Sequence, residues 1–122
     1  MQLRLRNLIT IIAQSTKEAG TSELAADYNL LQNIVVELKC KGEQSKYALG
    51  YIEEINHRGD TVFHVLYSEV DQLKVNDYYK VFSGVILYIA AAPELHNYKV
   101  KYYLVPDNYS KMLDNALKDY LM

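Results

Sequence analysis

The chain has few of the residues that build disulfide-bonded or metal-stabilised proteins: one cysteine, two prolines and no tryptophan in 122 residues. The single cysteine, Cys40, cannot form an intrachain disulfide and offers too few thiolates for a cysteine-built zinc site. The sequence therefore predicts a reducing, intracellular compartment, and a single domain that holds neither a metal nor a cofactor.

Signals that would direct the chain to a membrane are also missing. The longest apolar run, Val85 to Pro93, falls far short of the roughly 20 residues that a membrane-spanning helix needs. The N-terminus, "MQLRLRNLITIIAQS", places two arginines before an apolar run, but Thr10 interrupts that run and no small-residue cleavage site follows. We expect no membrane association, and we expect the N-terminus to be part of the fold.

Positive charge is not in excess: 13 Lys and Arg oppose 15 Asp and Glu, which gives a net charge of −2. This balance argues against binding of nucleic acid through bulk charge, although a local basic groove is compatible with it. What the chain has in quantity is tyrosine, with 12 residues. Tyrosine suits β-strands and offers a ring face for stacking, so these residues either fill the faces of a sheet or form a base-stacking surface.

From residue 33 onward, apolar and polar residues alternate with the period of two that indicates β-strands. The expected strands cover residues 33–42, 46–56, 61–70, 78–92 and 97–105. Turn-forming residues at 57–60 predict a hairpin between the second and third of these strands. Gly50 and Gly84 interrupt strand interiors, where glycine marks a bulge or a bend. Consecutive antiparallel strands with such bends predict a small barrel.

The two ends of the chain carry other patterns. Residues 3–13 fit either a strand or the start of a helix, and we favour the strand. Residues 22–31 fit a short helix or an ordered excursion. The last segment, residues 108–122, has apolar residues spaced by three and four, which predicts an amphipathic helix. The stripe on this helix consists of Tyr109, Met112, Leu113, Ala116, Leu117, Tyr120 and Leu121.

The strand pattern, with "YALGYIEEINHRGDTVFHVLYSE", "LKVNDYYKVFSGVILYI" and "NYKVKYYLVP", resembles an OB-fold. The first strand of the barrel is then either "IVVELKC" or "YALGYIEEI". A barrel of this length followed by one helix is similar to the smallest subunit of heterotrimeric replication protein A or of the related telomere-capping (CST-type) complex. The expected fold is mainly β: an antiparallel OB-fold barrel of five to six strands at 33–105, an N-terminal extension at 1–32 and a C-terminal helix at 107–121.

The resemblance implies a non-catalytic subunit in the nucleus. In those families the small subunit docks its helix and barrel onto a larger OB-fold subunit and scarcely contacts DNA itself. The apolar stripe of the C-terminal helix would then be the partner-binding surface, and single-stranded DNA would be bound mainly through the partners. An alternative is an autonomous protein that binds single-stranded nucleic acid by tyrosine stacking.

Basic and aromatic residues that could contact a nucleic acid are spread over several strands. This candidate set consists of Lys46, Tyr47, Tyr51, Arg58, Tyr67, Lys99, Lys101 and Tyr102, with Lys39, Lys41 and Tyr103 as further members. In the last strand, alternation puts Lys99 and Lys101 on one face and Tyr98, Val100 and Tyr102 on the other. Lysines and tyrosines of this strand therefore do not converge on one surface.

Residues that could carry out catalysis are few. The only histidines are His57, His64 and His96, two of them in predicted turns, and Glu53 and Glu54 are adjacent in a strand and so point to opposite faces. Cys40 falls on an apolar strand face and is expected to be a small buried hydrophobe. We expect no enzyme activity, although a small enzyme with an unrecognised site is a third possibility.

Overall fold

The computed structural model describes residues 2–15, 20–21, 32–54, 61–81 and 98–121. Two helices and a mainly β middle part make up these residues. The elements are α1 (Gln2–Ser15), β1 (Gly20–Thr21), β2 (Asn33–Cys40), β3 (Lys46–Glu54), β4 (Thr61–Ser68), β5 (Tyr78–Val81), β6 (Tyr98–Leu104) and α3 (Asp107–Leu121).

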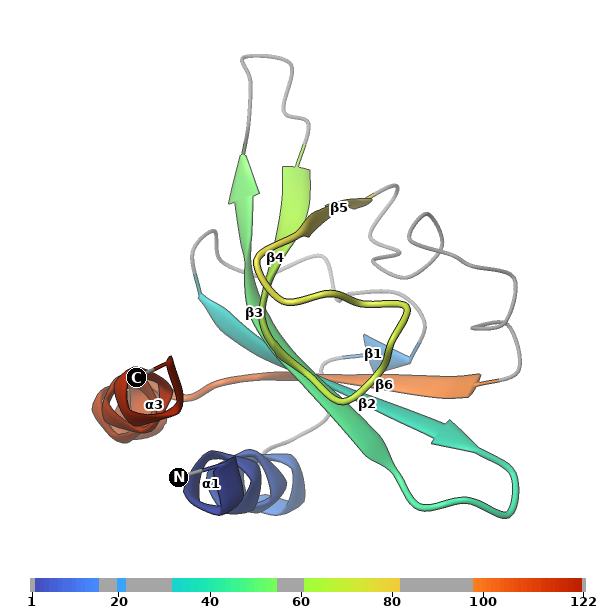
Figure 1. Cartoon of the computed structure of the whole chain (residues 1–122), viewed down its shortest axis with the longest axis horizontal. Coiled ribbons are helices and arrows are strands. Elements are labelled where there is room, and N and C mark those ends of the chain that lie inside the picture. The colour runs from blue at the N-terminus through green and yellow to red at the C-terminus, as the bar shows by residue number, and fades with distance from the viewer. Residues whose placement is uncertain (1, 16–19, 22–31, 55–60, 82–97, 122) are drawn as a thin grey trace.

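The strands form one antiparallel sheet in the order β1-β6-β2-β3-β4-β5, in which β1 contributes only two residues. Strands β2 to β5 follow one another as a meander, and β6 returns to lie beside β2. The mainly β fold and the C-terminal helix are thus confirmed. Over the described residues the sheet is open, with β1 and β5 at its edges, and a closed barrel is not seen (Figure 1).

The preference for a strand at residues 3–13 was wrong, because α1 covers this segment. Its buried side chains are Leu5, Leu8, Ile9 and Ile12, whose spacing of three, four and seven is that of one helix face. The apolar residues of this segment fit the period of a strand as well as that of a helix. The helix is the one that packs its apolar face against the sheet and α3. The segment contributes to the core, in agreement with the expectation that the N-terminus is part of the fold.

Both faces of the sheet are covered by apolar side chains, which explains why β2 is buried at three successive positions. On one face, Ile34, Val36 and Leu38 pack with Phe63 and Tyr102 in a cluster that we call the sheet-side core. The other face carries the helices, and there Val35, Leu49 and Tyr103 join α1 and α3 in the helix-side core.

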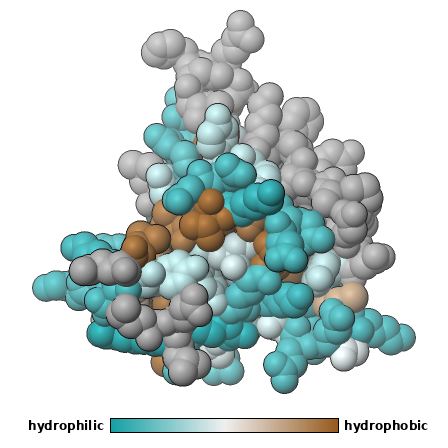
Figure 2. All heavy atoms as spheres, viewed as in Figure 1, coloured by the Kyte–Doolittle hydropathy of each residue, from teal (hydrophilic) through white to brown (hydrophobic). Residues whose placement is uncertain are grey.

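Helices α1 and α3 lie side by side against one part of the sheet, away from β5 (Figure 1). Figure 2 shows that, on the face in view, apolar atoms gather near the centre of the molecule and polar atoms surround them. In the part of the chain that the structure covers, neither helix is long and apolar enough to cross a membrane.

The predicted bend at Gly50 is confirmed, since the pairing register of β3 and β4 shifts between Leu49 and Gly50. The hairpin of these two strands is confirmed by their antiparallel pairing. Gly84, the turn at 57–60 with Arg58, the segment 22–31, and His57 and His96 lie outside the described residues.

Cys40, the last residue of β2, is half-buried, whereas the sequence predicted a buried side chain. It follows Ile34, Val36 and Leu38 in the alternation of the strand, but it lies at the strand end, where the cover is thinner.

Candidate functional site

The apolar stripe of α3 is mostly covered by the protein itself. Leu113, Ala116 and Leu117 are buried in the helix-side core, and Tyr109 and Tyr120 are half-buried against it. Helix α1 supplies much of this cover, because it packs directly along α3. Two residues of the stripe stay exposed: Met112 at 53% and Leu121 at 60%. These two alone are free to meet a partner.

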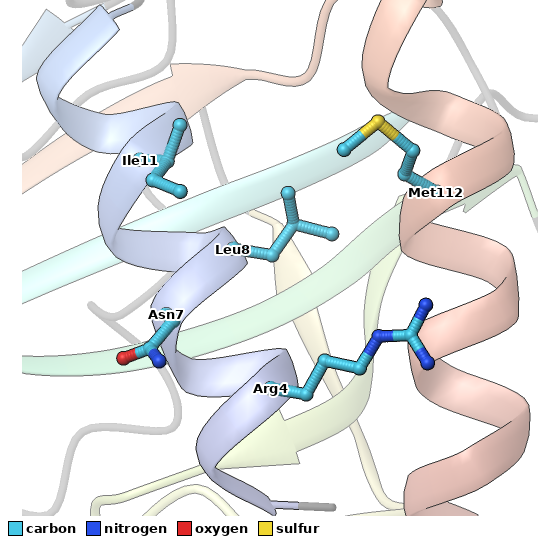
Figure 3. A pocket seen from close by; sticks show the side chains of 5 residues that line it. All are labelled: Arg4, Asn7, Leu8, Ile11 and Met112. Carbon is cyan, nitrogen blue, oxygen red and sulfur yellow. The ribbon is translucent and has the colours of Figure 1, made fainter.

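A shallow groove runs between the two helices beside Met112 (Figure 3). It encloses about 210 Å³ and is lined by Arg4, Asn7, Leu8, Ile11 and Met112. Ile11 is 46% exposed, and Figure 3 shows it on α1 opposite the α3 side that carries Met112. We call this feature the helix groove.

Three tyrosines of the predicted nucleic-acid set are in the interior. Tyr47 and Tyr67 are buried in the helix-side core, and Tyr102 is fully buried in the sheet-side core. Because these three rings are buried, they are not accessible to bases, and the prediction that they stack on bases is wrong. The alternation of a strand places a residue on a face, but it does not say whether a helix covers that face.

A polar network that the sequence did not indicate joins α1 to this part of the sheet. The Glu69 carboxylate accepts a hydrogen bond from the backbone N–H of Tyr47 at 3.0 Å and another from the Tyr67 hydroxyl. The Arg6 guanidinium pairs with the same carboxylate and lies 4.4 Å from the centre of the Tyr47 ring. Burial, and then the hydrogen bond and charge of Glu69, raise the pKa of Tyr67 well above its usual value.

A second carboxylate, Glu37, is held in a similar way. It accepts hydrogen bonds from the Tyr103 hydroxyl at 2.9 Å and from the Ser45 hydroxyl at 2.7 Å. Burial raises the pKa of Tyr47, and the negative charge of Glu37 adds to this effect. Both carboxylates fix the orientation of a tyrosine hydroxyl, Tyr67 on Glu69 and Tyr103 on Glu37, which is a structural role. Arg6 and Glu69 were missed because residues so far apart in sequence become neighbours only when α1 packs on the sheet.

The predicted lysines separate into two groups. Lys99 and Lys101 are exposed on β6, on the face opposite Tyr98 and Tyr102, as the alternation predicted. Lys46 is exposed too, but it pairs with Leu38 and so belongs to the other face of the sheet.

Beyond the bulge, three aromatic rings stand in a row on adjacent strands. Tyr51 of β3 pairs with His64 of β4, which pairs with Tyr78 of β5. The rings of Tyr51 and His64 stack, with centroids 4.9 Å apart and planes at 15°, and the ring of Tyr78 follows at 5.6 Å and 46°. The Glu53 carboxylate accepts from His64 Nε2 at 2.6 Å. We call Tyr51, His64 and Tyr78 the aromatic column.

The aromatic column lies on the face of the sheet away from the sheet-side core. Its neighbours in sequence, Ile52, Phe63 and Tyr79, all pack into that core, so the column must point the other way. Tyr78 is 62% exposed, and Tyr51 and His64 are half-buried. Figure 1 shows the ends of β3 and β4 and the strand β5 well away from the two helices.

Of the predicted set, only Tyr51 belongs to the column. His64 and Tyr78 were missed, because strand register brings them beside Tyr51 and no local pattern does. The column can bind a planar ring by stacking, and Glu53 can accept a hydrogen bond beside it. Among the described residues there is no group of three side chains suited to hold a metal ion. Comparison with protein-family models, with curated proteins and with solved structures finds no match to this chain.

Proposed function

We propose that this protein is a non-catalytic binding protein that takes up single-stranded nucleic acid by stacking bases on the aromatic column. The observation that carries the proposal is the row of rings formed by Tyr51, His64 and Tyr78 on three adjacent strands, with Tyr78 exposed at its end. Sheets that present aromatic rings in this manner are a common platform for unstacked bases.

The ends of the column are where a base would stack. His64 lies between two rings, so its faces are already in contact, whereas Tyr78 belongs to β5 and is the most exposed ring. A base on the outer face of Tyr78 or of Tyr51 would extend the row. Each stacked base contributes about 1–3 kcal/mol in such sites, whatever its identity, so binding should show little sequence preference.

The test is a fluorescence-anisotropy titration of a labelled single-stranded oligonucleotide with the purified protein. Tyr78→Ala should weaken binding by about 5- to 150-fold, the equivalent of one lost stacking contact. Tyr78→Phe, which keeps the ring, should bind as the parent does. Met112→Ala is the matched control, because it removes an exposed apolar side chain on α3, far from the column in the fold.

Unchanged binding by Tyr78→Ala, with unchanged thermal unfolding, would contradict the proposal. So would an equal loss in the alanine and phenylalanine variants, because the ring would then not be the binding element. Double-stranded DNA is the control competitor. Its bases are already stacked on one another, so it should displace the labelled oligonucleotide poorly.

The helix groove supports a second candidate, the docking subunit that the resemblance implies. Ile11 and Met112 are large apolar side chains that stay exposed on either side of it. The occupant would be an apolar side chain from a helix of a larger OB-fold subunit. In that case the protein would be a scaffold in a nuclear replication or telomere complex, and single-stranded DNA would be bound mainly by the partner.

The second candidate also includes a more specific fold, the OB-type barrel. In an OB-type barrel the sheet closes on itself, so the second candidate includes the proposal that this sheet closes. Function is tested independently by placing a photoreactive methionine analogue at Met112. We expect one specific crosslinked partner, and loss of the crosslink in Ile11→Glu. The same crosslinker at Asp114, an exposed position off the stripe, is the control; equal crosslinking there would contradict docking in the groove.

A further inference from the structure

A second uncovered part of the helix-bearing face of the sheet lies at the free ends of β2 and β6. Lys39 and Lys99 are directly opposite each other in the strand pairing, and Lys101 is opposite Glu37. Residues directly opposite in an antiparallel pair share one face, so all four side chains project from the same side. They line a hollow of about 290 Å³. We call these three lysines and the hollow between them the lysine corner.

The charges of the lysine corner are not balanced within the described part of the chain. Like charges directly opposite on neighbouring strands destabilise a sheet, and Lys39 and Lys99 form such a pair. Glu37 is the one acidic residue that lines the hollow. Its two oxygens are engaged by the Tyr103 and Ser45 hydroxyls, and none of the lysines that the structure describes forms an ion pair with it.

The geometry of Glu37 also decides where an anion would lie. The carboxylate is held by two hydroxyls at 2.9 and 2.7 Å, so a move that neutralises Lys39 or Lys99 would break both hydrogen bonds. Three ammonium groups against one carboxylate leave a local surplus of two positive charges. This surplus favours a ligand that carries two or more negative charges and lies on the lysine side of the hollow, away from the Glu37 carboxylate.

We propose that the lysine corner is a binding site for phosphate groups, with Lys39, Lys99 and Lys101 as the contacting residues. Lysine ammonium groups are compact point charges with three donors each, which suits the several oxygens of a phosphate. The bound phosphate relieves the repulsion between Lys39 and Lys99. The site is separate from the aromatic column and from the helix groove, so it does not depend on either proposed function.

The test uses pyrophosphate as the probe and the amide signals of residues 39, 99 and 101 in NMR spectra as the readout. We expect saturable shifts at these residues in the parent protein. The double variant Lys39→Gln/Lys99→Gln should bind pyrophosphate at least tenfold more weakly. The matched control is Lys111→Gln/Lys118→Gln, which removes two exposed lysines of α3 and should leave binding unchanged.

Thermal unfolding gives a second readout. Pyrophosphate should raise the melting temperature of the parent and of the control variant, but not that of Lys39→Gln/Lys99→Gln. Without pyrophosphate, the double variant should be at least as stable as the parent, since it has lost a repulsive pair. Equal binding of pyrophosphate by the double variant and the parent would overturn the proposal.

The source of the phosphate is resolved by repeating the titration with a single-stranded oligonucleotide at several salt concentrations. If the phosphates belong to a nucleic-acid backbone, the same amides shift, and each lysine removed lowers the salt slope of the affinity by about 0.7. If only pyrophosphate shifts these amides, the ligand is a small phosphate compound. Both results support the phosphate site. Shifts with neither probe would overturn it, whether or not the oligonucleotide binds at the aromatic column.

Discussion

Replacing Gly50 by alanine should damage this protein more than the small size of a methyl group suggests. A Cβ at Gly50 would lie 1.9 Å from the backbone oxygen of His64 and 2.8 Å from two carbons of the Phe63 ring. A carbon and a carbonyl oxygen normally stay about 3.3 Å apart or more. Strand β4 would therefore have to move away from β3 by more than about 1 Å at the bulge.

The cost of this movement has two parts. Forcing an extra carbon into a packed region costs about 1–3 kcal/mol. Displacing β4 also weakens one or two ladder hydrogen bonds, each of which contributes about 1 kcal/mol. The sum, about 2–5 kcal/mol, is a large share of the 5–15 kcal/mol by which a typical domain is stable, so we expect a lowered free energy of unfolding.

Urea denaturation, followed by far-ultraviolet circular dichroism, measures this effect. With a slope of about 2 kcal/mol per M, the urea midpoint of Gly50→Ala should fall by about 1–2.5 M. Gly42→Ala is the control: Gly42 has a φ of 82° but no atom within 4 Å of an added Cβ, so only backbone strain of about 1–2 kcal/mol applies. A midpoint for Gly50→Ala at or above that of Gly42→Ala would refute the reasoning.

Three further predictions concern the core and its edges. Below about pH 10 the Tyr67 hydroxyl is protonated in both the folded and the unfolded protein, because its pKa is raised in the folded state. Above about pH 10 the unfolded protein releases this proton first, so the free energy of unfolding should fall as the pH rises. In urea titrations at several pH values, this fall should be smaller for Tyr67→Phe. Leu113→Glu should unfold or aggregate the isolated protein, whereas Met112→Glu should leave its melting temperature nearly unchanged; a well-folded Leu113→Glu would place this residue outside the core. Half-buried Cys40 should react with a thiol reagent more slowly in the native than in the denatured protein, and equal rates would show that the native strand end gives it no cover.

Local patterns predicted the features that depend on neighbours in sequence. The period of three and four located α3, and the glycine within a strand located the bulge at Gly50. The alternation of β6 correctly placed Lys99 and Lys101 on one face of the sheet and Tyr102 on the other. Each of these follows from the geometry of one element, which a short stretch of sequence contains.

Features that depend on contacts between distant segments were not predicted. The spacing of apolar residues on α3 predicts a partner-binding surface, because no local pattern shows that α1 covers most of this stripe. Residues 3–13 fit a strand as well as a helix, so the sequence did not identify α1 either. The aromatic column was not predicted either, because it is the pairing register of β3, β4 and β5 that places Tyr51, His64 and Tyr78 in one row. Register is a property of paired strands, so no single strand reveals it.

The most direct test of the proposed function is an NMR measurement of contacts between the protein and a short single-stranded oligothymidylate. If bases stack on the aromatic column, ring protons of Tyr78 or Tyr51 should show intermolecular nuclear Overhauser effects to base protons, and these should vanish in Tyr78→Ala/Tyr51→Ala. Saturable binding with all such contacts elsewhere on the protein, or no binding at all, would contradict the account.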